Sequence, residues 1–463
     1  MENKNTQERE QMKTFDVVII GGGPGGMAAG ITLSKTGKSV ALIQDEKDSF
    51  GGICLNRGCM PTKSLLKAAG AYRHAKESNK YGLDMVCKQV DLQRLLDVTH
   101  GDLEQLRGMT HQMISMSKIT AFRGKGSFLS DKEIQVAQTN GSTETVCGST
   151  IIIATGSKPV ELPFAPFDGR YILSTDHLLK NTELPVNLLI IGGGAVGCEF
   201  ATLYNTFGSR VTIVEAMDTL LPREDREAGH ALQCSFDKQG ILVKTQTIIE
   251  KLIVNNGKVT VHYKGISTTD TVDKVLVGVG RRPNIEELNL DAAQIDTENG
   301  TLKVNDCLQT NVPHIYCIGD AAGGMMLAHA AEKEGQLLAR NLIQETSLPL
   351  DETAVPRVAF SHPEVAAVGT TKEIDGIKAF TMPQVPNGRS IVDKVAPAFV
   401  KLYVRDGSLE IAGAIIIGEA ATEMIHEIAL AVENRLTLAQ IGKTVHAHPT
   451  HSKNILQAVH YFN

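Results

Sequence analysis

Apolar and polar positions near the start of the chain follow the pattern of a β-α-β unit. Residues 15–20 form a short apolar run rich in β-branched side chains, which is typical of a buried strand. A glycine-rich turn at residues 21–26 (GGGPGG) comes next, then a helix-like stretch at residues 27–36 and a second apolar run at residues 39–43. The pattern therefore predicts a strand, a tight turn, a helix and a strand in that order.

The same order of segments returns in the middle of the chain. Residues 187–191 form an apolar run, residues 192–197 read GGGAVG, residues 198–207 have helical character and residues 210–214 form another apolar run. A duplicated β-α-β unit is an internal repeat at the scale of a domain. We therefore expect an α/β protein with two Rossmann-like dinucleotide-binding domains.

The last part of the chain has a different pattern. Strands are expected at residues 399–404 and 411–417, an amphipathic helix follows at residues 421–434, and no glycine fingerprint occurs there. The proline-containing segment at residues 159–166 (PVELPFAP) is interpreted as a linker between the two units, and the one at residues 346–350 (TSLPL) as the start of a third region. This third region, from about residue 351 to the end, is expected to have α+β character.

Each glycine run has the spacing G-x-G-x-x-G between a strand and a helix, which is the context that the dinucleotide fingerprint requires. The glycines concerned are Gly21, Gly23 and Gly26 in the first run, and Gly192, Gly194 and Gly197 in the second. The first glycine of such a run permits a tight turn, the second lets the backbone approach a pyrophosphate, and the third allows close packing of helix on strand.

The residue at the end of the following strand discriminates further. It is Glu215 in the second unit, where a carboxylate accepts hydrogen bonds from the ribose hydroxyls and repels a 2′-phosphate, so NAD is favoured over NADP. The matching residue of the first unit is Gln44, whose amide oxygen can accept one hydrogen bond without charge assistance. We expect nucleotide binding at both loops, with some loss of affinity at the first.

Bulk composition narrows the class of protein. The chain has 463 residues, 42% hydrophobic and 21% charged, with a net charge of −6, and nothing in these values indicates nucleic acid or a membrane surface as a partner. No apolar run approaches the roughly 18 residues that a membrane span needs. The N-terminal stretch MENKNTQEREQMKT lacks the apolar core of a secretory signal and is interpreted as a frayed extension, so a cytoplasmic location is expected.

Two of the eight cysteines, Cys54 and Cys59, have only four residues between them. A structural zinc site would need a second pair of ligands at a recognisable spacing, and the other cysteines are scattered. A thiolate at the start of a helix is stabilised by the helix N-terminus, and Lys63, one turn after Cys59, adds positive charge. The pair is therefore predicted to be a redox-active pair, and no metal is expected.

The segment around these cysteines, GGICLNRGCMPTK, resembles the redox-active disulfide motif of the class I flavoprotein disulfide reductases, most closely the dihydrolipoamide dehydrogenases. The resemblance continues along the chain in the motifs ATGS (154–157), VGVGRRPN (277–284), IGDAAGGMMLAHAAEKEG (318–335), SHPEVAAVG (361–369) and HAHPT (446–450). It implies an NAD-dependent oxidoreductase that carries FAD and acts on a dithiol or a disulfide.

The resemblance also implies roles for residues at matching positions. Cys54 would attack the substrate, Cys59 would face the flavin, and Lys63 would lie near the flavin paired with Glu199. Flavin-binding residues would include those of the first fingerprint, Gln44 and Lys63, together with Gly52, Gly126, Ser157, Asp320, Met326, Leu327, Ala328 and His329. NAD-binding residues would be those of the second fingerprint together with Glu215 and Gly280.

The domain limits implied are 14–150 with 281–350 for FAD, 151–280 for NAD, and 351–463 for the interface of a homodimer. The HAHPT segment would reach the active site of the other subunit. Its His448 matches the acid-base histidine of the family, whereas His446, His451 and His460 are interpreted as bystanders. A 2-oxoacid dehydrogenase or glycine-cleavage complex is a partner implied by the same resemblance.

One position departs from the family pattern. A glutamate is expected five residues after the histidine, and this chain has Lys453 there. An ammonium disfavours a protonated imidazole by repulsion and cannot accept its N–H, so proton transfer by His448 is expected to be weakened or retuned.

Two other functions stay open from the sequence. One is NADH-dependent reduction of a different disulfide, although Glu215 argues against NADPH-linked glutathione-type reductases. The absence of any cysteine after Cys317 argues against mercuric and large thioredoxin reductases. The other is a nucleotide-binding subunit that has lost its catalytic activity. This function is disfavoured because four residues with catalytic roles in the family are present: Cys54, Cys59, Lys63 and His448.

Overall fold

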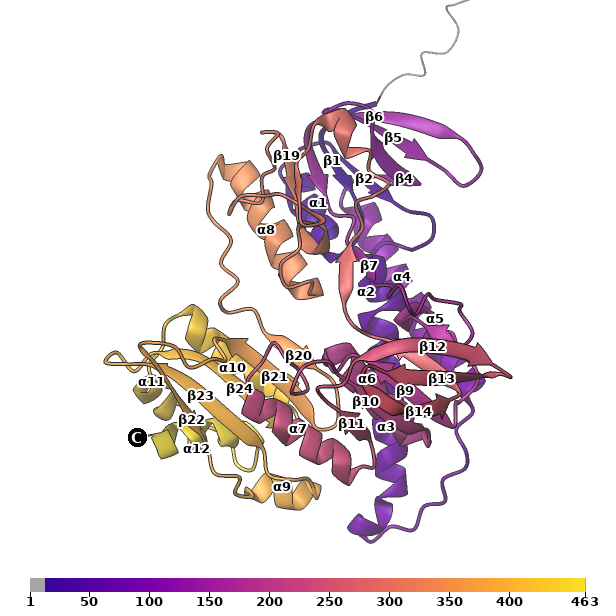
Figure 1. Cartoon of the computed structure of the whole chain (residues 1–463). Helices are drawn as coiled ribbons and strands as arrows, with labels where there is room; N and C mark the ends of the chain where they lie inside the picture. The colour runs from indigo at the N-terminus through magenta and orange to yellow at the C-terminus, as the bar shows by residue number, and fades with distance from the viewer. Residues whose placement is uncertain (1–12, 463) are drawn as a thin grey trace, which may run out of the picture. The chain divides into compact units, whose positions relative to one another are not determined.

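The computed structural model of the chain describes residues 13–462 (Figure 1). The segment interpreted above as a frayed extension lies, up to residue 12, outside the described residues. The fold divides into two compact units. Unit 1 holds the residues up to Thr62 together with 98–159 and 281–350, and unit 2 holds residues 63–97, 160–280 and 351–463.

Unit 1 is built on a parallel sheet in the strand order β3-β2-β1-β6-β19. These strands are β1 (Lys13–Ile20), β2 (Val40–Gln44), β3 (Thr120–Arg123), β6 (Thr143–Ile153) and β19 (Ile315–Cys317). The first half of β6 leaves this sheet to pair antiparallel with β5 (Glu133–Ala137), which pairs in turn with β4 (Lys125–Phe128). The order is that of a nucleotide-binding fold, with the β1 loop at the centre of the sheet.

Helices α1 (Pro24–Ser34) and α8 (Ala328–Gln344) lie side by side in unit 1 (Figure 1). Glycines allow the contact, because a Cβ on Gly335 would lie 2.3 Å from the carbonyl oxygen of Gly25. A first apolar core lies between these helices and the sheet, and a second core, containing Phe128 and Ile134, involves the β4-β5-β6 strands. Unit 1 also contains α2 (Gly52–Arg57), β7 (Ser157–Pro159), β16 (Arg281–Pro283), η2 (Leu290–Ala293), β17 (Thr297–Glu298), β18 (Thr301–Leu302), η3 (Gly319–Ala322) and most of α4 (Leu92–Met116).

Unit 2 contains a second parallel sheet with an equivalent order, β11-β10-β9-β15-β8. Its strands are β8 (Ile172–Leu173), β9 (Asn187–Ile191), β10 (Arg210–Val214), β11 (Leu242–Lys244) and β15 (Lys274–Val277). An antiparallel sheet of β12 (Ile249–Asn255), β13 (Lys258–Tyr263) and β14 (Ile266–Val272) is inserted between β11 and β15, as the β4-β5 hairpin is inserted in unit 1. The helices here are α3 (Cys59–Lys76, from Lys63 on), η1 (Ser78–Tyr81), α5 (Thr175–Leu178), α6 (Ala195–Phe207) and α7 (Arg226–Lys238).

The C-terminal part of unit 2 is an antiparallel sheet in the order β20-β21-β24-β23-β22. Its strands are β20 (Arg357–Ala359), β21 (Glu364–Gly369), β22 (Ile377–Thr381), β23 (Phe399–Arg405) and β24 (Ile411–Gly418). Both faces of this sheet are buried. In β24, Ile416 packs into the core shared with α10 (Ala421–Glu433), α11 (Leu438–Gly442) and α12 (Lys453–Phe462), whereas Ile415 packs into the core shared with α6 and α7. Burial on both faces explains why these strands are continuous apolar runs in the sequence. The short helix α9 (Gly388–Asp393) precedes β23.

The sequence prediction of two dinucleotide-binding folds followed by an α+β region is confirmed. The two helices after the glycine loops begin three residues earlier than predicted, at Pro24 and Ala195, because each starts directly after the second fingerprint glycine. Strand β6 crosses the expected domain limit at residue 150, since its residues up to Ile153 pair with β1 and β19.

Candidate active site

The first glycine loop has the geometry that its spacing predicts. Gly21 has φ +116°, and a Cβ there would lie 2.1 Å from the carbonyl oxygen of Ala154. A Cβ on Gly26 would lie 2.0 Å from the carbonyl oxygen of Gly21, so this glycine is required for the helix to pack against the turn. At Gly23, by contrast, no heavy atom of residues 13–462, chain neighbours aside, lies within 4 Å of an added Cβ. The loop thus leaves open space at the N-terminus of α1, where backbone amides can meet a phosphate.

The second loop repeats this arrangement. Gly192 has φ +106° and faces the carbonyl oxygen of Gly278, while a Cβ on Gly197 would lie 2.0 Å from the carbonyl oxygen of Gly192. Gly194 is again open: chain neighbours aside, no heavy atom in the described part of the chain lies within 4 Å of an added Cβ. Both loops therefore combine two sterically required glycines with one exposed to an approaching ligand.

Gln44 and Glu215 hold equivalent positions, and both are buried. The amide oxygen Oε1 of Gln44 accepts a hydrogen bond from the Gly22 N–H at 2.9 Å. The carboxylate of Glu215 accepts from the Gly193 N–H at 2.6 Å and from the Met217 N–H at 2.8 Å. Sequence reasoning expected these side chains to meet a ribose. The structure shows in addition that each of them braces its own glycine loop.

Cys54 and Cys59 lie on two consecutive helices. Cys54 is in the middle of α2, and Cys59 is the first residue of α3. Gly58 separates the helices because its backbone, at φ −136° and ψ −110°, leaves helical geometry. Both cysteines are half-buried. Cys59 thus lies at the N-terminus of a long helix, whose dipole favours a thiolate.

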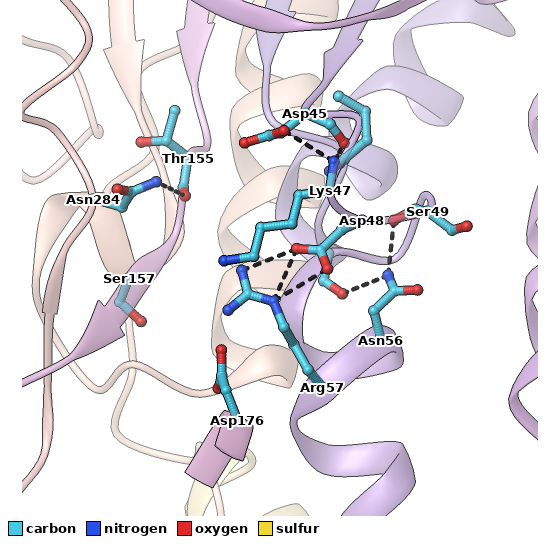
Figure 2. A network of polar contacts seen from close by, with 12 residues as sticks. Asp45, Lys47, Asp48, Ser49, Asn56, Arg57, Thr155, Ser157, Asp176 and Asn284 are labelled. Carbon is cyan, nitrogen blue, oxygen red and sulfur yellow. Dashed lines mark hydrogen bonds and ion pairs between the residues drawn. The ribbon is translucent and has the colours of Figure 1, made fainter. Parts of the chain in front are cut away.

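The segment leading to Cys54 is fixed by polar contacts, which Figure 2 shows. Arg57 donates from Nε and Nη2 to the carboxylate of Asp48, with distances of 3.1 and 3.0 Å. Asn56 donates from Nδ2 to the carbonyl oxygens of Ser49 and Gly52, both at 2.8 Å. These contacts join the loop after β2 to helix α2 and orient the helix that carries Cys54.

Lys63 and Glu199 form the ion pair that the resemblance implied. Lys63 Nζ lies 2.8 Å from Oε1 and 2.9 Å from Oε2 of Glu199. Glu199 also accepts from the backbone N–H of Phe360 at 2.9 Å, and Lys63 Nζ lies 4.7 Å from the centre of the Phe360 ring. The Glu199 side chain is 7% exposed, so its carboxylate is a buried charge that accepts three hydrogen bonds, and it fixes the direction of the lysine in α3.

Three more of the residues predicted for FAD, Gly52, Ser157 and Asp320, can be placed by their surroundings in unit 1. A Cβ on Gly52 would lie 2.8 Å from the Cα of Gly23, so the start of α2 abuts the open part of the loop. The hydroxyl of Ser157 donates to the Asp320 carboxylate and accepts from Arg281 Nε at 2.7 Å. Sequence reasoning did not single out Arg281, although the motif VGVGRRPN contains it.

Three further predicted segments can be placed on the fold. Gly126 lies in β4, against the side chain of Ile20. Met326 and Leu327 precede α8, and Ala328 and His329 begin that helix. Gly280 has φ +124° and open space around an added Cβ.

Two buried polar atoms in unit 1 have no hydrogen-bond partner within residues 13–462: Thr155 Oγ1 and Arg123 Nη1. Thr155 lies two residues after the end of β6, and its backbone nitrogen would be 3.1 Å from a Cβ added to Gly21. Arg123 is the last residue of β3. Buried polar groups are rarely left without a hydrogen-bond partner, so a bound polar ligand would explain these two atoms. These two atoms and the open space at Gly23 fit a dinucleotide such as FAD.

The other buried cysteines are not candidates for redox chemistry. Burial raises the pKa of the Cys198 and Cys317 thiols well above their ordinary range, and nearby carboxylates act in the same direction. Since only a thiolate is nucleophilic, neither thiol reacts readily at neutral pH.

The segment of His448 lies in unit 2, in the loop before α12. The His448 side chain is exposed, and its Nδ1 accepts a hydrogen bond from Lys453 Nζ at 3.3 Å. His446, interpreted from sequence as a bystander, is 4% exposed, and its Nε2 lies 2.9 Å from Oε1 of Glu427. The fold thus gives a carboxylate to His446 and an ammonium to His448.

Together, these observations describe a protein with two glycine loops of the dinucleotide-binding type, a cysteine pair on consecutive helices and a C-terminal α+β region. The sequence profile of the pyridine nucleotide-disulphide oxidoreductases matches residues 15–335, and that of their dimerisation domain matches residues 355–459. The chain belongs to the pyridine nucleotide-disulphide oxidoreductase family.

Curated relatives agree with this assignment. The chain is 35% identical over 451 residues to a dihydrolipoyl dehydrogenase of Bacillus subtilis (strain 168), covering 96% of this chain and 97% of the relative. It is 36% identical over 445 residues to that of Chlamydia pneumoniae, covering 95% of each.

Two solved structures are also similar. LpdA of Mycobacterium tuberculosis has a TM-score of 0.90 at 25% identity, covering 98% of this chain and all (100%) of that one. A flavoprotein disulfide reductase of Escherichia coli that is induced by HOCl, RclA, has a TM-score of 0.87 at 26% identity, with the same coverage.

The protein is therefore an NAD-dependent oxidoreductase that acts on sulfur groups and uses FAD and NAD, as the sequence predicted. Within residues 13–462, no helix is both long and apolar enough to cross a membrane.

Proposed function

We propose that the protein oxidises dihydrolipoamide-type dithiols with NAD through a redox disulfide between Cys54 and Cys59. The observation that carries the proposal is the placement of Cys59 as the first residue of α3, directly after the short helix of Cys54. Identity to curated dihydrolipoyl dehydrogenases over nearly the whole chain supports the substrate class.

In the proposed reaction, one substrate thiolate attacks Sγ of Cys54, which breaks the enzyme disulfide and leaves Cys59 as a thiolate. The second substrate thiolate then attacks the substrate sulfur of the mixed disulfide and releases Cys54. The substrate leaves as a cyclic disulfide, and two electrons stay on the cysteines. FAD, when bound, supplies the two-electron relay from the cysteine pair to NAD.

The residues of the chain have separate tasks in this proposal. The helix N-terminus at Cys59 favours the thiolate, and the Lys63–Glu199 pair keeps a cation one turn further along α3. His448 is the acid-base residue for the substrate thiols, modified by Lys453. FAD occupies the domain of residues 14–150 and 281–350, with Ser157 and Asp320 among its contacts, and NAD occupies the domain of residues 151–280.

The proposal includes a homodimer formed through residues 351–463, because the profile of the dimerisation domain matches residues 355–459. A cytoplasmic enzyme fits this reaction, since a reducing compartment keeps the cysteine pair able to cycle. Association with a 2-oxoacid dehydrogenase or glycine-cleavage complex is part of the same proposal and can be tested by co-purification.

Serine variants test the cysteine roles. Cys54→Ser and Cys59→Ser are each expected to abolish NAD reduction by dihydrolipoamide, while FAD stays bound. The unaltered protein after two-electron reduction, and Cys54→Ser without any reduction, should show a long-wavelength charge-transfer band that Cys59→Ser lacks. Cys234→Ser, at an exposed cysteine, is the matched control and should change nothing. Turnover by Cys54→Ser comparable to the unaltered protein would overturn the proposal.

A second candidate is NADH-dependent reduction of another disulfide. The hydrogen bond from Lys453 to His448 favours it, since the site lacks the carboxylate partner that would help the histidine to take a proton from a dithiol. Similarity to a flavoprotein disulfide reductase of Escherichia coli agrees with this candidate. Assaying NADH oxidation with a panel of disulfides, beside dihydrolipoamide oxidation, separates the two.

A further inference from the structure

The contact between Lys453 and His448 determines which histidine nitrogen can carry a proton. Lys453 Nζ lies 3.3 Å from Nδ1 of His448. An ammonium has donors and no acceptor, so Nδ1 must offer its lone pair. A neutral imidazole then carries its hydrogen on Nε2, and Nε2–H is the group left to face a reactant.

Among the described residues, no carboxylate is hydrogen-bonded to His448 in place of Lys453. Two carboxylates contact the same segment of chain, and each is already engaged with another histidine. Glu427 pairs with His446 at 2.9 Å, and Asp393 pairs with His451 at 2.9 Å. Asp393 also accepts from Arg389 at 2.6 Å.

The neighbouring helix α9 leaves room for the imidazole. A Cβ added to Gly388, the first residue of α9, would lie 3.9 Å from Cε1 of His448. The helix is held by a buried hydrogen bond from Asn387 to Asn454, next to Lys453 in α12. The absence of a side chain at Gly388 thus leaves this side of the ring open, and Lys453 supplies the polar contact of the ring.

The charge of the pair decides what proton chemistry is available. A histidine beside a carboxylate has a total charge of −1 and becomes neutral when it takes a proton. The Lys453–His448 pair already has a charge of +1 and would reach +2. Since Nε2 already carries the hydrogen, it has no lone pair with which to take a proton from a thiol, whereas an anion that approaches Nε2–H meets both a donor and a positive charge.

We propose that Lys453 is a positioning and specificity residue that makes the site accept sulfur as a preformed thiolate. The substrates favoured are dithiols and disulfides whose thiols are acidic enough to be ionised without a base. The reverse reaction passes through the same transition state, so a leaving thiolate departs as an anion hydrogen-bonded to Nε2–H. This inference rests on the proposed role of His448 as the residue that faces the substrate sulfur.

Kinetics of Lys453→Glu, with Lys443→Glu as control, test the inference. Lys443 is exposed, lies before the same histidine segment, and undergoes the same change of charge. In the unaltered protein, kcat/KM for dihydrolipoamide should rise about tenfold per pH unit below the ionisation of its thiols. Lys453→Glu should raise kcat/KM at pH 7 at least tenfold and flatten this dependence, and Lys443→Glu should do neither.

Substrate ranking supplies the second kinetic measurement. With NADH, the unaltered protein should have a higher kcat/KM for an aromatic disulfide such as dithiobis(nitrobenzoate) than for lipoamide. In Lys453→Glu, the ratio of the two kcat/KM values should shift toward lipoamide by at least tenfold. An unchanged pH profile together with an unchanged ranking would overturn the inference.

A spectroscopic measurement tests the hydrogen bond without turnover. With ¹⁵N-histidine label, the His448 signals, identified among the 14 histidines by their loss in His448→Gln, should show hydrogen on Nε2 and a bare Nδ1. Lys453→Glu should move the hydrogen to Nδ1. Hydrogen on Nδ1 in the unaltered protein would refute the inference, whereas failure to turn over either class of substrate would contradict the proposed function.

Discussion

Replacing either of two glycines in the second loop by alanine should have a different effect at each position, one on NAD binding and the other on stability. Gly194 has an extended backbone, at φ −73° and ψ −176°, and an added Cβ has no heavy atom within 4 Å. Three residues later, a Cβ on Gly197 would lie 2.0 Å from the carbonyl oxygen of Gly192. Gly194→Ala should therefore weaken NAD binding in a folded protein, and Gly197→Ala should weaken the fold itself.

The magnitudes follow from these contacts. Non-bonded carbon contacts are normally about 3.5 Å or more, so α6 must move by over an ångström to accept Gly197→Ala. Overpacking of this kind costs about 1–3 kcal/mol, and a backbone neighbour places this case at the upper end. Gly194→Ala should change the free energy of unfolding by less than about 1 kcal/mol, because alanine fits this backbone. Its methyl group fills the space expected for the pyrophosphate, and a loss of about 1.4 kcal/mol raises the Kd for NAD tenfold.

Urea unfolding and NAD titration of the FAD-loaded protein measure the two effects separately. Bound FAD is an internal control, since both substitutions lie in the other nucleotide loop. Gly23→Ala and Gly26→Ala form a matched pair in that FAD loop and should reproduce the same split for FAD. The reasoning is refuted if Gly194→Ala binds NAD within twofold of the unaltered protein, or if Gly197→Ala is equally stable.

Three further substitutions test the buried polar groups. Gln44→Glu should lower the Kd for FAD about fivefold, because its hydrogen bond from the Gly22 N–H becomes charge-assisted; an unchanged Kd in FAD titration of the apoprotein would contradict this. Glu215→Gln should raise the Kd for NAD several-fold and lower the free energy of unfolding by about 1 kcal/mol, since it weakens the brace on the second loop. Burial, aided by the charge of Arg73, lowers the pKa of His362 from 6.5 to about 4. The unfolded chain therefore binds the proton first, and stability present above pH 6.5 is lost as the pH falls toward 4, at up to about 1.4 kcal/mol per pH unit. His362→Gln should flatten this slope in urea unfolding at pH 5 and pH 7.5, and equal slopes would count against it.

The nucleotide loops could be predicted from sequence because their signals are local. A strand, three glycines and a helix lie within a short stretch, and the steric reason for each glycine comes from its neighbours in the chain. The bounds of β9 and β10 were predicted to the residue for the same reason. The bracing of the loops by Gln44 and Glu215 was missed, since it depends on how the end of one strand lies against the turn after another.

The cysteine region shows where sequence reasoning stops. The spacing of Cys54 and Cys59 predicted a redox pair, but the break at Gly58 depends on a backbone conformation that no composition signal announces. The bidentate ion pair between Arg57 and Asp48 was not predicted, because it joins a loop to a helix through side chains that look like ordinary surface charges in the sequence. The Lys63–Glu199 pair spans 136 positions of sequence and was expected only through the family resemblance.

The contacts of the three histidines 446, 448 and 451 indicate that Lys453 does more than remove an acidic partner from His448. His446 and His451 each contact a carboxylate, so acidic side chains are available at this end of the chain. The histidine proposed to face the substrate is the one that receives a cation instead. In the proposed reaction, electron transfer uses the cysteine pair and the two nucleotide loops, and in the described part of the chain Lys453 contacts none of these. On that proposal Lys453 acts on proton transfer alone, and the acidity of the substrate thiol is the property by which the site would select what it oxidises or reduces.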